Sequence, residues 1–200
     1  MKLMQPGVYC SSIADIIKKQ TTVIADFPHP PVAFIDVTSI WRNPQINTLA
    51  CQALNDLYER HDYDAIVALE ARAWPFAQQM SLTLNKPWYP VRKPGKLPGK
   101  IVHQSYDCEY ATGGMLELQS NVIPPDSQVI IVDDLIATGG TAIATKQLVQ
   151  QVGAEVVGVA TIYGLDYLLT PQVIAELGEV RCVVHYVSEP EPYTPPSVKR

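Results

Sequence analysis

Apolar positions along the chain follow two spacings, and together they predict strands that alternate with helices. Short apolar and β-branched runs are typical of buried strands; they lie at 32–37, 65–69, 88–91, 128–132, 155–163 and 180–187. Apolar residues at helical spacing, or short segments with helix-start signals, predict helices at 12–20, 44–60, 75–84, 141–152 and 171–177. Strands separated by helices pair in parallel. We therefore expect the α/β class: a single domain with a mainly parallel sheet flanked by helices.

Two stretches do not fit this alternation. Residues 93–114 contain several glycines and prolines, and we expect them to form a long, flexible hood with some strand near 101–106. Residues 189–200 contain four prolines and are expected to lie over the surface or to be disordered. The predicted organisation is a domain at 1–188 that carries the hood, followed by a proline-rich tail.

The composition is that of a globular protein with one large core. Of the 200 residues, 47% are apolar and 18% are charged. The 15 basic and 20 acidic residues give a net charge of −5, so there is no positive field to hold a nucleic acid. We find neither a signal peptide nor an apolar run near the roughly 18 residues of a membrane span, and expect a cytoplasmic protein without a membrane partner. The cysteines are scattered and predict neither a disulfide framework nor a metal site: Cys10, Cys51, Cys108 and Cys182.

The strongest candidate for chemistry is the segment 129–141, whose sequence is VIIVDDLIATGGT. An apolar strand leads into Asp133 and Asp134, and a Gly/Thr turn then opens a helix. Such a turn lies at the carboxyl end of a sheet strand, where ligands bind in open α/β folds. Its glycines allow the backbone to approach a ligand, and the helix start offers free N–H groups. With the hydroxyls of Thr138 and Thr141 as further donors, the segment is a candidate site for a phosphate monoester.

The acidic pair narrows the choice of ligand. A Walker A loop needs a lysine after its glycines, and this turn has none, so a nucleoside triphosphatase is disfavoured. Two carboxylates beside a phosphate would repel it unless they bind something else, and vicinal ribose hydroxyls are suitable donors to them. A sugar phosphate satisfies both halves of the motif. The alternative is structural, in which the Asp-Asp pair only ends a strand and caps a turn.

The same segment resembles the phosphoribosyl-pyrophosphate signature of type I phosphoribosyltransferases. Within that family, the sequence is most similar to adenine phosphoribosyltransferases, over about residues 25–160. The matching motifs, in the family's order, are DFPHP with VAFID at 26–36, RKPGKLPG at 92–99 and SYDCEY at 105–110. The resemblance implies the type I phosphoribosyltransferase fold and an enzyme of purine salvage, which joins a purine base to phosphoribosyl pyrophosphate.

The resemblance also assigns a base-binding set. Phe34 would stack on the purine, and backbone groups around Ala33 and Ile35 would read its edge. Glu109, on the hood, would hold the base near N7 and assist proton movement. Read alone, an aromatic residue in an apolar strand is more often part of a core.

A second set is implied to bind phosphoribosyl pyrophosphate. Asp133 and Asp134 would hold the ribose hydroxyls and, with Glu109, act as catalytic residues. Arg92 and Lys96 would address the pyrophosphate, although the basic residues of this loop could equally be solvated. The full set is Arg72, Arg92, Lys93, Lys96, Asp133, Asp134, Ala137, Thr138, Gly139, Gly140 and Thr141.

The implied chemistry suits these groups. Breaking the bond from C1′ to pyrophosphate builds positive charge on the sugar and negative charge on the leaving group. Carboxylates beneath the ring, and cations with Mg²⁺ at the pyrophosphate, face those charges. The Mg²⁺ is expected to arrive with phosphoribosyl pyrophosphate, so no metal-ligand residues are assigned. Family members are commonly dimers, which implies a homodimer here.

The sequence departs from the family's pattern beside both substrates. Ile35 stands where an arginine is usual, Glu70 replaces an aspartate, and an insertion falls at 112–114. Residues 163–167, in a loop that helps enclose the base in relatives, also differ. Adenine is the leading base, but hypoxanthine, guanine and xanthine remain alternatives, because one or two contacts discriminate among them.

A function from another class is also open. The same fold could serve a non-catalytic regulator that senses a purine or phosphoribosyl pyrophosphate. Such a sensor has no need of Arg92, Lys96 and Glu109, and all three are present. The sequence therefore favours the enzyme.

Overall fold

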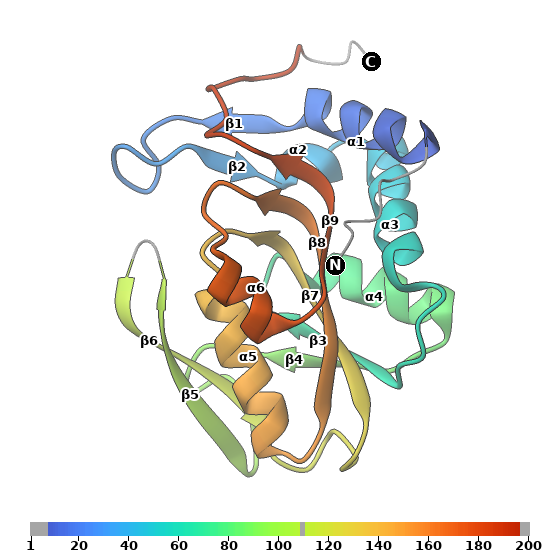
Figure 1. Cartoon of the computed structure of the whole chain (residues 1–200), viewed down its shortest axis with the longest axis vertical. Coiled ribbons are helices and arrows are strands. Elements are labelled where there is room, and N and C mark those ends of the chain that lie inside the picture. The colour runs from blue at the N-terminus through green and yellow to red at the C-terminus, as the bar shows by residue number, and fades with distance from the viewer. Residues whose placement is uncertain (1–7, 109–110, 197–200) are drawn as a thin grey trace.

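A parallel sheet of five strands forms the centre of the molecule, in the order β4-β3-β7-β8-β9 (Figure 1). The computed structural model describes residues 8–108 and 111–196. The strands are β3 (Ala65–Leu69), β4 (Trp88–Val91), β7 (Gln128–Ile136), β8 (Glu155–Leu165) and β9 (Val180–Tyr186). Every neighbouring pair is parallel. The predicted class is thereby confirmed, since parallel strands need crossover connections and helices supply most of them.

Helices cover both faces of this sheet (Figure 1). Helices α3 and α4 pack on one face with α1 beside α3, whereas α5 packs on the other face and contacts α6. Successive side chains of β7 point to opposite faces: Ile130 and Val132 belong to the core under α3 and α4, and Val129 and Ile131 to the core under α5. The helices are α1 (Val8–Gln20), α3 (Pro44–Tyr58), α4 (Trp74–Leu84), α5 (Gly140–Gln151) and α6 (Pro171–Leu177).

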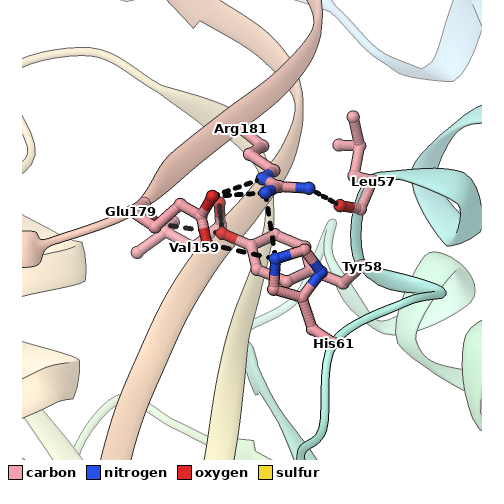
Figure 2. A network of polar contacts seen from close by, with 6 residues as sticks. All are labelled: Leu57, Tyr58, His61, Val159, Glu179 and Arg181. Atoms are coloured by element: carbon pink, nitrogen blue, oxygen red, sulfur yellow. Dashed lines mark hydrogen bonds and ion pairs between the residues drawn. The ribbon is translucent and has the colours of Figure 1, made fainter. Parts of the chain in front are cut away.

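A polar network ties the end of α3 to the sheet (Figure 2). The Tyr58 hydroxyl donates to the carbonyl oxygens of Val159, at 3.3 Å, and Glu179, at 3.0 Å. The Arg181 guanidinium lies 5.0 Å from the centre of the Tyr58 ring and pairs with the Glu179 carboxylate. His61 joins through its Nε2, 2.9 Å from Arg181 Nη2. These contacts lie towards the amino ends of β8 and β9, away from the edge of the sheet where ligands of such folds bind.

Two antiparallel hairpins extend the central domain. The first pairs β1 with β2 and leads into the short helix α2, and the second pairs β5 with β6 and packs on α5. These elements are β1 (Thr22–Ile24), β2 (Phe34–Asp36), α2 (Thr38–Trp41), β5 (Ile101–Cys108) and β6 (Ala111–Gln119).

The hood is more regular than the sequence predicts. Only a short strand near 101–106 was expected, whereas most of 101–119 forms a hairpin. Gly114 explains part of the difference, because it lies opposite Tyr106 and a Cβ there would come within 2.7 Å of the Tyr106 ring. The glycine therefore serves close strand packing and does not mark a loop.

The other predicted elements agree with the structure apart from their ends. Strand β7 continues beyond the predicted end at 132, because β8 is long enough to pair with it as far as Ile136. Asp133 and Asp134 thus lie inside the strand and do not follow it, which corrects the prediction. Of the tail, the structure describes 189–196, which are exposed along most of their length; 197–200 lie outside the described residues. None of the helices described is both long and apolar enough to cross a membrane.

Candidate active site

A pocket of about 300 Å³ opens at the carboxyl ends of β3, β7 and β8. Its walls come from β2, the turn after β3, the hood, the segment that joins β7 to α5, and the end of β8. Twelve of the predicted residues line it: Ala33, Phe34, Ile35, Arg72, Lys93, Asp133, Asp134, Ala137, Thr138, Gly139, Gly140 and Thr141. Residues that are far apart in the sequence thus meet at the place where an α/β sheet binds its ligands.

The acidic pair is held in an unfavourable electrostatic environment. Asp134 is only 3% exposed, and its Oδ2 lies 3.0 Å from Arg72 Nε. Asp133 accepts a hydrogen bond of 2.8 Å from the backbone N–H of Asp134. Burial raises the pKa of Asp133 well above its usual range, and the charge of Asp134 raises it further. Burial also raises the pKa of Asp134, although Arg72 opposes this. Such perturbed carboxyl groups in a pocket are typical of functional sites.

The turn before α5 leaves the start of that helix open. Gly139 is the N-cap residue, has a φ of +85° and makes no side-chain cap. The first N–H groups of an α-helix have no partner within the helix, so they are available to an anion in the pocket. A Cβ on Gly139 would lie 2.5 Å from Cγ1 of Val173 in α6. Both the backbone conformation and the close packing of α6 therefore require glycine here.

A cation lies over the expected purine platform. The Arg72 guanidinium is 5.2 Å from the centre of the Phe34 ring, and Phe27 meets the same ring edge-on at 4.9 Å. Ile35, where relatives were expected to have an arginine, is only 3% exposed and packs in the core. Arg72 is therefore a cation beside the aromatic ring and also the partner of the buried Asp134.

Two carboxylates hold the basic loop that follows β4. Glu70 Oε2 accepts hydrogen bonds from Arg92 Nε at 3.2 Å and from the backbone N–H of Lys93 at 2.9 Å. Burial acts to raise the pKa of Glu70, but these two bonds and the nearby positive charges lower it overall. On the other side, the buried Glu117 accepts a bond of 3.0 Å from the N–H of Gly95. Glu70, expected only as a departure from the family, is thus an anchor of this loop.

The structure does not bring every predicted residue to the pocket wall. Arg92 and Lys96 do not line it: Arg92 contacts Glu70 and donates to the carbonyl oxygen of Lys96 at 3.1 Å. Lys96 itself is exposed. Glu109 lies outside the described residues, so its predicted role stays a prediction. Sequence reasoning missed the apolar part of the wall, because single leucines there look like core: Leu69, Leu116, Leu135 and Leu165.

Comparison with known proteins assigns this arrangement to a family. The family model for the phosphoribosyl transferase domain matches residues 36–167, which contain every lining residue named above except Ala33, Phe34 and Ile35. The chain belongs to the phosphoribosyltransferase family.

Individual phosphoribosyltransferases are similar over most of the chain. The adenine phosphoribosyltransferase of Petrotoga mobilis is 37% identical over 170 residues, which are 85% of this chain and 97% of the relative. That of Cutibacterium acnes is 42% identical over 154 residues, or 77% and 86% of the two chains. The crystal structure of the Saccharomyces cerevisiae enzyme, complexed with adenine and an iminoaltritol bisphosphate, aligns with a TM-score of 0.78 at 35% identity. That alignment covers 86% of this chain and 99% of the yeast chain.

Proposed function

We propose that the chain is an adenine phosphoribosyltransferase, which transfers the 5-phosphoribosyl group from phosphoribosyl pyrophosphate to adenine and releases AMP and pyrophosphate. The observation that carries this proposal is a single pocket whose wall combines an acidic pair, an open helix start and an aromatic ring. The first two suit a ribose 5-phosphate and the third suits a purine base. The relatives named above, which are adenine phosphoribosyltransferases, support the same activity and a place in purine salvage.

The described residues divide between the two substrates. Asp133 and Asp134 accept hydrogen bonds from the ribose hydroxyls and face the positive charge that develops on the sugar. The turn from Ala137 to Thr141 holds the 5-phosphate against the start of α5. Phe34 stacks on the base. Glu109 lies outside the described residues, and its role beside the base rests on the family resemblance alone.

The charges near the pocket suit an anionic leaving group and its metal ion. Arg72 and Lys93 both line the pocket and supply positive charge for the pyrophosphate. Among the described residues, no group of three or more His, Cys, Asp or Glu side chains is arranged to hold a metal ion. Mg²⁺ is proposed to arrive on the oxygens of phosphoribosyl pyrophosphate, where it would help Arg72 and Lys93 to neutralise the leaving pyrophosphate.

Within the proposed domain at 1–188, we expect the hood at 93–114 to close over the bound substrates. Its basic loop is exposed and is held mainly through Glu70 and Glu117, so a pyrophosphate can draw it towards the pocket. Hydrogen exchange of 93–114 should therefore slow when phosphoribosyl pyrophosphate and Mg²⁺ are added, and ribose 5-phosphate alone serves as the control. Unchanged exchange across the hood, with binding established by calorimetry, would contradict the closing movement.

The choice of base is tested with a panel of purines. With phosphoribosyl pyrophosphate and Mg²⁺ present, we expect kcat/KM for adenine to exceed that for hypoxanthine, guanine and xanthine at least about tenfold. That preference corresponds to about 1.4 kcal/mol, which one well-placed hydrogen bond can supply. Nucleotide products are identified by mass, and the Asp133→Asn, Asp134→Asn double variant gives the background.

The panel also separates the alternatives. A higher kcat/KM for a 6-oxopurine would overturn adenine and leave the phosphoribosyltransferase assignment intact. Binding of a purine and of phosphoribosyl pyrophosphate without any nucleotide product would instead indicate a non-catalytic sensor.

The setting of the enzyme is proposed to be the cytoplasm, where it acts as a homodimer. Cys51 and Cys182 are free and buried, which suits a reducing compartment. The dimer rests on the resemblance to the family. Light scattering during size-exclusion chromatography measures the molar mass, and a monomer at micromolar concentration would contradict the dimer.

A further inference from the structure

The proline-rich tail crosses the surface without being anchored by burial. After Tyr186 at the end of β9, the chain passes over an open cavity of about 680 Å³ that is lined on the other side by Lys18 and Lys19. Val187 is 79% exposed and Tyr193 is 46% exposed. The tail therefore gains little from the hydrophobic effect, and its position needs another explanation.

A pair of backbone hydrogen bonds fixes the tail to β1. The N–H of Val23 donates to the carbonyl oxygen of Tyr193 at 2.7 Å, and the N–H of Tyr193 donates to the carbonyl oxygen of Val23 at 2.9 Å. The two residues form an antiparallel bridge, and Figure 1 shows the red tail passing beside β1. Tyr193 thus occupies the free edge of β1, on the side away from β2.

The strand that the tail holds belongs to the hairpin that carries the proposed base platform. Val23 pairs with Ile35 on β2, and the next pair along the hairpin is Ile24 with Phe34. Tyr193, Val23 and Ile35 therefore lie opposite one another on three adjacent strand segments, and Phe34 is the neighbour of Ile35 along β2. Each strand of this hairpin has only three residues, and an isolated two-stranded hairpin is marginally stable in water. A third strand segment at its edge is expected to restrict its position.

Ile35 packs in the core and Arg72 lies over Phe34, but the hydrogen bonds described between β1 and segments other than β2 and the tail lie at the base of the hairpin. The N–H of Thr22 donates to Ser39 Oγ at 3.1 Å, and the hydroxyl of Thr21 lies 2.7 Å from that of Tyr163. Both contacts precede Val23 along β1. The bridge to Tyr193 is one step closer to the pair that contains Phe34. Pro190 and Pro192, on either side of Glu191, limit the slack of the tail because proline fixes φ.

We propose that the tail is a strap that positions the base-binding hairpin through the backbone of Tyr193. Tyr193 is a positioning residue, since it does not line the pocket. The strap rests on the proposed function in one respect, namely that Phe34 binds the base. It should affect binding of the base and leave binding of phosphoribosyl pyrophosphate to the acidic pair and the α5 turn unchanged.

Truncation separates this role from a general effect on stability. A chain that ends after Val187 lacks the bridge, whereas a control chain that ends after Pro196 keeps it. Because apparent affinity falls with the fraction of molecules whose site is in place, we expect the first truncation to raise KM for adenine about three- to tenfold. The dissociation constant for phosphoribosyl pyrophosphate, measured by calorimetry, should stay within about twofold. The amide of Val23, which donates to Tyr193, should exchange faster by NMR.

A matched pair of point variants tests the bridge itself in the full chain. Tyr193→Pro removes the N–H that donates to Val23, and Glu191→Pro introduces the same residue at a position outside the bridge. Tyr193→Pro keeps the carbonyl oxygen that accepts from Val23, so the bridge is weakened to one bond. Only this variant of the two should raise KM for adenine and speed exchange at Val23, each less than the truncation does. Unchanged exchange at Val23 in both the truncation and Tyr193→Pro would overturn the strap.

The failure of the strap is distinguishable from failure of the base site. If the hairpin exchanges faster while KM for adenine is unchanged, Phe34→Ala in the full chain decides between the two. A raised KM for adenine in Phe34→Ala would show that the base site is correct and that the strap does not position it. An unchanged KM in Phe34→Ala would overturn the base site, and the strap with it.

Discussion

Asp134→Asn should lower kcat/KM for phosphoribosyl pyrophosphate by roughly 10- to 150-fold. The loss of a hydrogen bond to a charged partner costs about 1.5–3 kcal/mol, and each 1.36 kcal/mol is tenfold. The same change weakens the ion pair between Asp134 and Arg72, which lies over Phe34, so both ends of the pocket should be affected. Steady-state kinetics and calorimetric titration with phosphoribosyl pyrophosphate measure the effect.

Two further variants show whether the effect is specific. Asp62→Asn removes the same charge at an exposed position outside the pocket and should leave kcat/KM unchanged. Glu109→Ala should depress turnover but leave affinity for phosphoribosyl pyrophosphate near normal, because its partner is the base. If Asp133 and Asp134 are both neutralised and binding and activity persist, the acidic pair is only part of a strand.

Removing the charge of Asp133 should stabilise the unliganded protein, whereas removing the charge of Asp134 should impair activity. Because burial raises the pKa of Asp133 in the folded state, that state binds more protons than the unfolded one, and stability falls as pH rises through the folded-state pKa. The stability that protonated Asp133 contributes to the folded state is fully present only below the ordinary carboxyl pKa. Asp133→Asn is always neutral and can still accept from the N–H of Asp134. It should therefore raise Tm at neutral pH and flatten the dependence of Tm on pH.

Gly139→Ala should have the second large effect, on both stability and phosphate binding. A φ of +85° costs a residue with a Cβ about 1–2 kcal/mol, and the new Cβ would also lie 2.5 Å from Val173. Moving the turn by even a fraction of an ångström displaces the N–H groups at the start of α5. We expect at least about a tenfold loss of affinity for phosphoribosyl pyrophosphate, because each hydrogen bond to a charged group contributes about 1.5–3 kcal/mol.

The chain provides a matched control for this glycine. Gly153 also has a positive φ, of +83°, but a Cβ there would only touch Pro125 at 3.7 Å, and it lies outside the pocket. Gly153→Ala should lower Tm without weakening binding. Adding Val173→Ala to Gly139→Ala should restore part of the affinity, since it relieves the clash and leaves the strained φ. Normal binding by Gly139→Ala would contradict the assignment of this turn to the phosphate.

The parts of the site that could be predicted from sequence are those encoded in one continuous segment. Asp133, Asp134 and Gly139 lie within a few residues of each other, and the strand, turn and helix around them have strong local signals. The helix at 44–58 was equally predictable, because Asn43 and Pro44 supply its start. In these cases, local chemistry and the final fold agree.

The remaining features depend on contacts between distant segments. The contact of Arg72 with Phe34 exists only because β2 and the turn after β3 meet above the sheet, and no local pattern records that meeting. Gly114 in the sequence favours a loop, because nothing local shows that the Tyr106 ring lies opposite it. Strand β1 has three residues, too few for any periodicity, and it is completed by partners on β2 and in the tail.

The bridge between Val23 and Tyr193 also bears on how the protein is made. Synthesis proceeds from the amino end, so Val23 leaves the ribosome long before Tyr193. Until then the outer edge of β1 presents unpaired backbone groups, and such an edge is a template for pairing with other chains. Nascent or prematurely ended chains should therefore be more prone to aggregate than the full chain, even where the parallel sheet has already formed.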